Sequence, residues 1–176
     1  LVAESGAAQQ ITNGLIKIFG INYTKIAVML TGFIVGITMF YSVGFVILVP
    51  LVFTIAKATG LSLIGVGLPM LASLSVTHGF LPPHPAPSAL SVMFEADIGK
   101  TLIYGILLSI PAILISGPLL THFLPKVEAK PLKEFMTTRV FKQDELPSLF
   151  NSLSTALLPV LLIGFSTLIS LLIQEE

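Results

Sequence analysis

Two histidines and four prolines lie within eleven residues, in the stretch THGFLPPHPAP (residues 77 to 87), which has apolar sequence on both sides. An imidazole can bind a small anion, exchange a proton near neutral pH, or act as acid and base in an enzyme. It can also serve the structure alone, by capping free backbone carbonyls. A histidine-ligated metal is disfavoured, because Glu95 and Asp97 lie a helix away and no third ligand stands closer. The setting of the motif must decide among the remaining roles.

That setting is a membrane. The chain is 54% apolar and 10% charged, with a mean hydropathy of +0.97, which a water-soluble domain of this length does not normally show. Its charges are clustered and leave four uncharged runs of at least 25 residues, whereas about 20 suffice for one helical span. The net charge of zero argues against a nucleic-acid partner. The absence of cysteine excludes disulfides and thiolate chemistry.

The first uncharged run, Ile26 to Ala56, is too long for a simple span. Its 31 residues would make a helix of roughly 46 Å, against roughly 30 Å of hydrocarbon. The aromatic cluster MFYSVGF (39 to 45) contains Ser and Gly, and a turn there leaves limbs of 15 and 12 residues. Gly32, Gly36 and Pro50 fit closely packed helices better than lipid-facing ones. We therefore predict a re-entrant helical hairpin.

The second run predicts a transmembrane helix that is broken at the opening motif. Residues 61 to 76 and 87 to 99 each have helical character. Between them Pro82, Pro83, Pro85 and Pro87 remove backbone donors and force extended geometry on the residues before them. Unpaired backbone groups at membrane depth are tolerated only inside protein or beside a wet cavity. The break should therefore line a cavity.

The whole chain divides into six expected segments. They are an interfacial or partial helix (1–25), the re-entrant hairpin (26–57), the broken transmembrane helix (58–99), a transmembrane helix kinked at Pro111 and Pro118 (100–124), a cytoplasmic loop (125–147) and a last transmembrane helix (148–176). The loop is placed in the cytoplasm because it holds five of the nine basic residues. A hairpin, unlike a single span, puts Lys25 and Lys57 on that same side.

Together these features predict an all-α integral membrane protein: a fragment of a polytopic transporter, corresponding to about one half of an inverted repeat. A hairpin paired with a discontinuous helix is typical of secondary transporters, in which half-helix N-termini present positive dipole ends to an anionic substrate. The chain contains no phosphate-binding glycine loop and no HExxH or GxSxG motif. These patterns favour a transporter over an enzyme.

Several stretches closely resemble the gluconate permease family of bacterial sugar-acid proton symporters. The resemblance is carried by residues 32–56, 74–90 and 96–119, and it extends from ESGAAQQI (4–11) to ELPSLFNSLSTALLPVLL (145–162). It implies that a leading segment and most of a second, inverted half lie outside this chain. Members often carry Gly where this chain has Ala86, and an acidic residue where it has Ser42. If that carboxylate carries protons in relatives, this protein must use another group, another ion or another substrate.

The resemblance and the motifs together give the candidate site. We expect substrate contacts from Tyr41, Ser42, Gly44, Thr77, His78, Gly79, His84 and Ser88, with Pro82, Pro83, Pro85 and Pro87 shaping the break. With Ser42 in place of a carboxylate, His78 or His84 becomes the expected proton-coupling group, since imidazoles titrate near neutral pH.

The predicted function is proton-coupled uptake of gluconate, or a related small hydroxy-acid anion, by alternating access in the bacterial inner membrane. Neither a cofactor nor a metal is expected. The expected partners are the anionic substrate, the lipid bilayer and the remainder of the chain, and association into an oligomer is left open. The alternatives are a sodium-coupled carrier of D-serine-like substrates, a membrane-embedded enzyme that uses the histidine pair, and a structural membrane subunit.

Overall fold

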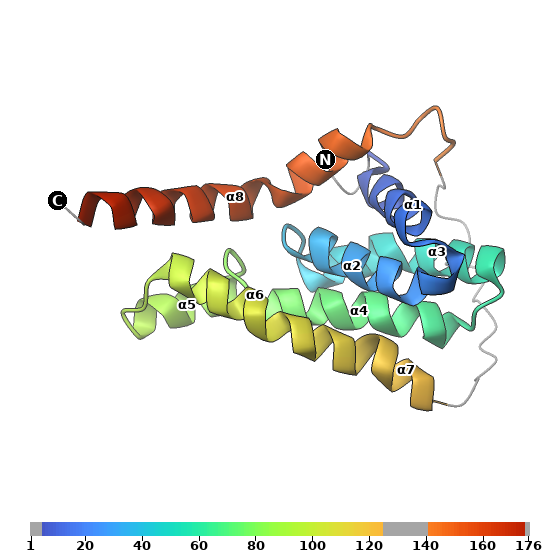
Figure 1. The fold of residues 1–176 in the computed structure, drawn as a ribbon, viewed down its shortest axis with the longest axis horizontal. Coiled ribbons are helices and arrows are strands. Elements are labelled where there is room, and N and C mark those ends of the chain that lie inside the picture. Colours follow the sequence, from blue (N-terminus) through green and yellow to red (C-terminus); the bar gives the residue numbers. More distant parts are fainter. Residues whose placement is uncertain (1–4, 125–140, 175–176) are drawn as a thin grey trace.

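The computed structural model describes residues 5–124 and 141–174, and every regular element in these ranges is a helix. In chain order the elements are α1 (Ala7–Phe19), η1 (Ile21–Tyr23), α2 (Thr24–Gly36), α3 (Tyr41–Thr59), α4 (Leu63–Phe80), α5 (Pro85–Met93), α6 (Ile98–Leu114), the π-helical segment η2 (Ile115–Leu119), α7 (Leu120–Phe123) and α8 (Leu149–Gln174). Figure 1 shows them along the chain from blue to red.

Within the described ranges, four helical stretches are long and apolar enough to cross a membrane. They are Tyr41–Thr59, Leu63–Met93, Ile98–Phe123 and Leu149–Ser170. In addition, α1 and the stretch Ile21–Gly36 form a pair bent by 119° at Gly20, whose φ of 82° lies in the region that favours glycine. The chain is therefore an all-α, polytopic membrane protein, as its composition predicted.

Two antiparallel helices, α2 and α3, are joined by a four-residue turn at residues 37 to 40 and lie beside α4 (Figure 1). The turn comes earlier in the chain than the pattern suggested, because the aromatic cluster belongs to the start of α3. There the amide of Gly44 already donates to Phe40 O at 2.9 Å. As a result the second limb has 19 residues, where the sequence suggested 12.

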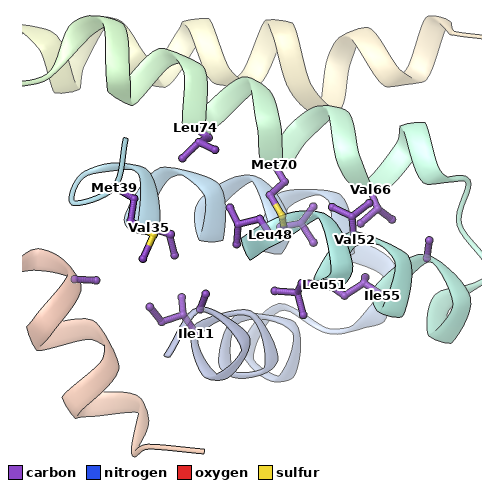
Figure 2. Packing of buried hydrophobic residues seen from close by; sticks show 14 residues of the cluster. Ile11, Val35, Met39, Leu48, Leu51, Val52, Ile55, Val66, Met70 and Leu74 are labelled. Atoms are coloured by element: carbon purple, nitrogen blue, oxygen red, sulfur yellow. The ribbon is translucent and has the colours of Figure 1, made fainter. Parts of the chain in front are cut away.

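The core lies where α2, α3 and α4 meet. Glycine allows α2 to approach α4 closely, because a Cβ at Gly32 would collide with the backbone carbonyl of Met70 and one at Gly36 with the side chain of Thr77. The buried apolar side chains around this contact include Ile11, Val35, Leu48, Met70 and Leu74 (Figure 2). The expected packing role of the Gly32 and Gly36 pair is confirmed.

Three segment ends that are distant in sequence meet at the base of this core. Lys25 Nζ, at the start of α2, donates to Thr121 Oγ1 in α7 at 3.2 Å. The same lysine lies beside Gly65, in the first turn of α4, where Ser62 Oγ accepts from the Gly65 amide at 3.0 Å. The start of α2, the start of α4 and the end of α7 therefore share one end of the molecule.

The span from α6 to α7 contains both expected prolines but remains helical throughout. Around Pro118 the helix widens, and the amide of Leu120 reaches Ile115 O, five residues back. Gly117 in this widened turn packs against Pro69 of α4. The sequence indicated kinks, and the structure shows how the one at Pro118 is accommodated.

Helix α1, in the segment expected to be an interfacial or partial helix, is divided between core and surface. Ile11 is fully buried, whereas Ile18 is 67% exposed near the bend at Gly20. Gln9 binds the later part of the predicted loop, because its side-chain amide accepts from Phe141 N at 3.0 Å and donates to Phe141 O at 2.8 Å. Most of that loop, residues 125–140, lies outside the described residues.

Candidate functional site

The proline motif interrupts the span Leu63–Met93 between Phe80 and Pro85. The amide of Leu81 still donates to Thr77 O at 3.0 Å, and that of His84 donates to Leu81 O at 3.1 Å, so the interruption is a compact turn. Pro85 then opens α5 at the first helical position, where its missing donor costs nothing. His78 is the central residue of the whole span, and the interruption begins one helical turn after it.

The two histidines of the motif contact each other across this interruption. His78 Nδ1 and His84 Nδ1 are 3.2 Å apart, and the ring centroids are separated by 4.7 Å. His84 Nε2 donates to the backbone carbonyl of Gly36, at the end of α2, at 2.6 Å. His84 is 5% exposed and His78 is half-buried. The histidine pair therefore joins the broken helix to the turn between α2 and α3.

Phe40, the residue that precedes α3, lies against both imidazoles. Its ring centroid is 5.8 Å from that of His78 and 6.3 Å from that of His84, with edge-on geometry in each case. His84 in turn precedes α5. The starts of two helices, α3 and α5, are thus brought together around the histidine pair.

Helix starts carry free amide donors and a partial positive charge. In α3 the first helical hydrogen bond is donated by the Gly44 amide, so the amides of residues 41 to 43 come before the hydrogen-bonded part of the helix. In α5 the first helical hydrogen bond is donated by the Ser88 amide. Before it, Ala86 carries an amide hydrogen, whereas its neighbours Pro85 and Pro87 carry none. Such donors suit a carboxylate or another small anion.

The other candidate residues divide into exposed and packed groups. Tyr41 and Ser42 are exposed in the first turn of α3, and Tyr41 stacks on Phe45 at 6.2 Å. Gly79 has open space where a side chain would lie, and Ser88 is half-buried. These four positions therefore have exposed or partly exposed surface, and their contact with substrate stays a prediction.

Thr77 and Gly44 are packed inside the protein. Thr77 Oγ1 donates to Ser73 O at 3.1 Å and Leu74 O at 2.9 Å, both in its own helix, and it lies against Gly36. Gly44 packs on Leu74. Of the break prolines, Pro82 and Pro87 are buried, whereas Pro83 and Pro85 are exposed. Thr77 therefore lies in the contact between α2 and α4, and Gly44 in the contact between α3 and α4.

Sequence reasoning overlooked two members of this arrangement, Phe40 and the carbonyl of Gly36. Phe40 ends the turn between α2 and α3 and Gly36 directly precedes it, but the motif they contact lies about forty residues further along the chain. An aromatic residue directly before a helix start was the available signal for Phe40. A backbone carbonyl leaves no signal in the sequence.

Comparison with known proteins identifies the family. The model of the GntP family permeases matches residues 1–176. The chain belongs to the GntP permease family. Among its relatives, the Gnt-II system L-idonate transporter of Escherichia coli K12 is 45% identical over 94% of this chain and 38% of its own length. A high-affinity gluconate transporter of the same strain is 45% identical over 99% of the chain and 40% of its own length. The gluconate permease of Bacillus subtilis 168 is 40% identical over 98% and 40% respectively.

Membership of the GntP permease family bears on two of the predicted classes. The family and these relatives are permeases and not enzymes. The chain is a multi-pass membrane protein, and its bacterial relatives fit the predicted inner membrane. The chain spans about two fifths of the length of the curated relatives it matches. No solved structure matches it.

Proposed function

We propose that this chain forms the substrate-binding part of a proton-coupled importer of gluconate or a related small hydroxy-acid anion. The names of the relatives support the substrate class, since they are gluconate and L-idonate transporters. The transporter works by alternating access in the bacterial inner membrane, and proton movement down its gradient drives uptake.

One observation carries the proposal. Two helix starts and a histidine pair meet midway along a membrane-spanning stretch, where unpaired polar groups are otherwise costly. A gluconate-like anion has a carboxylate at one end and several hydroxyls along its chain. Its carboxylate fits the amide donors of α3 and α5, and its hydroxyls fit partners such as Ser42 and Ser88.

The hairpin made by α2 and α3 enters the membrane and returns to its own side. Its tip reaches the middle of the broken span at the contact between His84 and Gly36, while Lys25 lies beside the start of α4 and the end of α7. We assign the shared end to the cytoplasm because the most basic segment of the chain follows α7.

Cysteine labelling tests this topology. Lys57→Cys and Lys142→Cys in the full-length protein should both be labelled from the cytoplasmic side. The hairpin brings the chain back to the side on which it began, and the next two spans cross the membrane once in each direction. Labelling of the two positions from opposite sides would contradict the hairpin.

Transport by the purified full-length protein in liposomes tests the function. We expect accumulation of intact labelled gluconate or L-idonate when the outside is more acidic, and counterflow of the same substrates without a gradient. Chemical conversion of the substrate would instead indicate an enzyme. Uptake that requires sodium and prefers D-serine would favour the sodium-coupled alternative, with Ser42 as a candidate oxygen ligand. Absence of any flux would leave a structural subunit.

A further inference from the structure

The hydrogen-bond partners of the histidine pair fix where its hydrogens lie. A backbone carbonyl only accepts, so His84 Nε2 must carry the hydrogen in its 2.6 Å bond to Gly36 O. In a neutral imidazole the other nitrogen then has a lone pair, and His84 Nδ1 is an acceptor. The 3.2 Å contact between the two Nδ1 atoms therefore takes its hydrogen from His78.

This arrangement leaves a single open nitrogen in the pair. With Nδ1 of His78 donating to His84, Nε2 of His78 is unprotonated and is not used by either contact. A proton arriving at that nitrogen breaks neither hydrogen bond. A proton arriving directly at His84 Nδ1 would instead set two N–H donors against each other.

Helix ends determine which ring keeps the positive charge once the proton has been added. His78 lies in the last turn of α4, where the helix dipole favours a cation. His84 lies at the start of α5, where the dipole disfavours one, and it is also more deeply buried. The ring of Phe40 lies edge-on at 5.8 Å from His78 and 6.3 Å from His84, so it does not distinguish the two rings.

The other titratable groups on the packed elements lie elsewhere or have other partners. Tyr41 on α3 stacks on Phe45, and Lys25 on α2 bonds to Thr121 at the far end. Lys57 is at the end of α3. Lys100 and Tyr104 on α6, with Glu95 and Asp97 before it, are exposed, and the Asp97 carboxylate accepts from the Lys100 amide. Among the described residues, the two imidazoles hydrogen-bond to each other and to Gly36 O, and their rings pack against Phe40.

We infer that His78 carries the transported proton and binds the substrate carboxylate through Nε2, and that His84 is a positioning residue that fixes the tautomer of His78. The inference rests on the proposed function and assigns separate roles to the two histidines. At the outward face, Nε2 of His78 takes a proton from water, and the resulting N–H donates to the carboxylate. At the inward face the carboxylate leaves, and Nε2 returns the proton to water. Anion and proton stabilise each other's binding, as symport requires.

Nitrogen NMR of the full-length protein in lipid, labelled with ¹⁵N-histidine, tests the hydrogen positions independently of transport. The signals are assigned by comparison with the His78→Gln and His84→Asn proteins. At high pH we expect His78 protonated at Nδ1 and His84 protonated at Nε2. On acidification, Nε2 of His78 should gain the first proton while His84 Nδ1 stays unprotonated. A neutral His78 protonated at Nε2, or a His84 that becomes doubly protonated first, would overturn the inference.

Three variants in liposomes test the roles. His78→Gln should lose substrate-dependent proton flux but keep counterflow, with roughly tenfold weaker substrate binding because a charge-assisted hydrogen bond is lost. His84→Leu and His84→Asn both remove the bond to Gly36, and only Asn supplies an oxygen that can accept from His78 Nδ1. Both should keep proton flux coupled to substrate, although at a lower rate of uptake, whereas the pH profile of uptake should shift in His84→Leu and be restored towards wild type in His84→Asn.

The outcomes separate this inference from the proposed function. Proton flux that persists in His78→Gln and disappears in both His84 variants would reverse the assignment while leaving proton-coupled transport in place. Wild-type protein that moves no sugar acid would remove the proposed function, even with the expected tautomers. Identical pH profiles in the two His84 variants would show that His84 does not act through His78.

Discussion

Two neighbouring membrane-spanning stretches, Leu63–Met93 and Ile98–Phe123, each contain several prolines and accommodate them differently. In Ile98–Phe123 the helix absorbs Pro111 without interruption and Pro118 by widening into a π turn. In Leu63–Met93 the helix absorbs Pro69 but stops at Phe80 and starts again at Pro85. A single proline removes one donor, and the neighbouring backbone can shift to compensate. Four prolines between residues 82 and 87 leave too few amide donors for such compensation. The spacing of the prolines therefore decides where the helix is interrupted.

The largest expected effect comes from closing the interruption. Replacing Pro82, Pro83 and Pro85 with Ala should lower transport about tenfold or more, because each replacement favours helix by about 3 kcal/mol and so disfavours the turn that holds His84. Membrane abundance should change little. Counterflow in liposomes and quantitative blotting measure the two quantities.

Pro118→Ala is the matched control for the triple variant. It removes a proline from the continuous span, where the π turn already supplies the backbone bonds, and should leave transport near wild type. Equal losses of transport in Pro118→Ala and in the triple variant would show that the spacing of the prolines does not explain the difference between the two spans.

Two glycines of Ile98–Phe123 that pack on α4 are expected to give an intermediate effect. A Cβ at Gly105 would lie 2.7 Å from the backbone oxygen of Phe80, where the break begins, whereas a Cβ at Gly117 would lie 3.1 Å from Pro69 Cα. Gly105→Ala should therefore destabilise the protein by about 1–3 kcal/mol, and Gly117→Ala by less. Thermal unfolding of the purified full-length protein measures both, and a larger loss for Gly117→Ala would contradict the packing described here.

The smallest effect is expected at the shared end of the molecule, where α2 contacts the end of the span Ile98–Phe123. Lys25→Met and Thr121→Val each remove the hydrogen bond between α2 and α7, which contributes about 1 kcal/mol. The double variant should lose little more than either single one, because both remove the same bond. Lys57→Met, at the exposed end of α3, serves as the control and should leave thermal stability unchanged. Additive losses in the double variant would mean that the two side chains act separately.

The sequence predicted the features that follow from local backbone chemistry. The prolines placed the interruption correctly, because a missing donor acts at its own position. Gly32 and Gly36 predicted close helix packing, since only a residue without a side chain permits it. Uncharged length predicted the apolar spans.

Features that depend on contacts between distant segments could not be read in the same way. The aromatic cluster was expected in the turn itself, but its residues begin α3, because Ser42 and Gly44 are tolerated in a first helical turn that packs on α4. The bond from His84 to Gly36 joins a side chain to a backbone atom 48 residues away, and no residue type announces such an acceptor. The hydroxyl of Thr77 donates to the backbone of α4 beside Gly36, which the sequence did not indicate, and its expected contact with substrate stays a prediction.

The glycine contacts between α2 and α4 have a mechanical consequence. With the backbone of α2 at Gly32 pressed against that of α4 at Met70, neither helix can slide past the other without separating. The two helices are therefore locked against each other, and with them Gly36 and His78, which hold the two ends of the contact chain through His84.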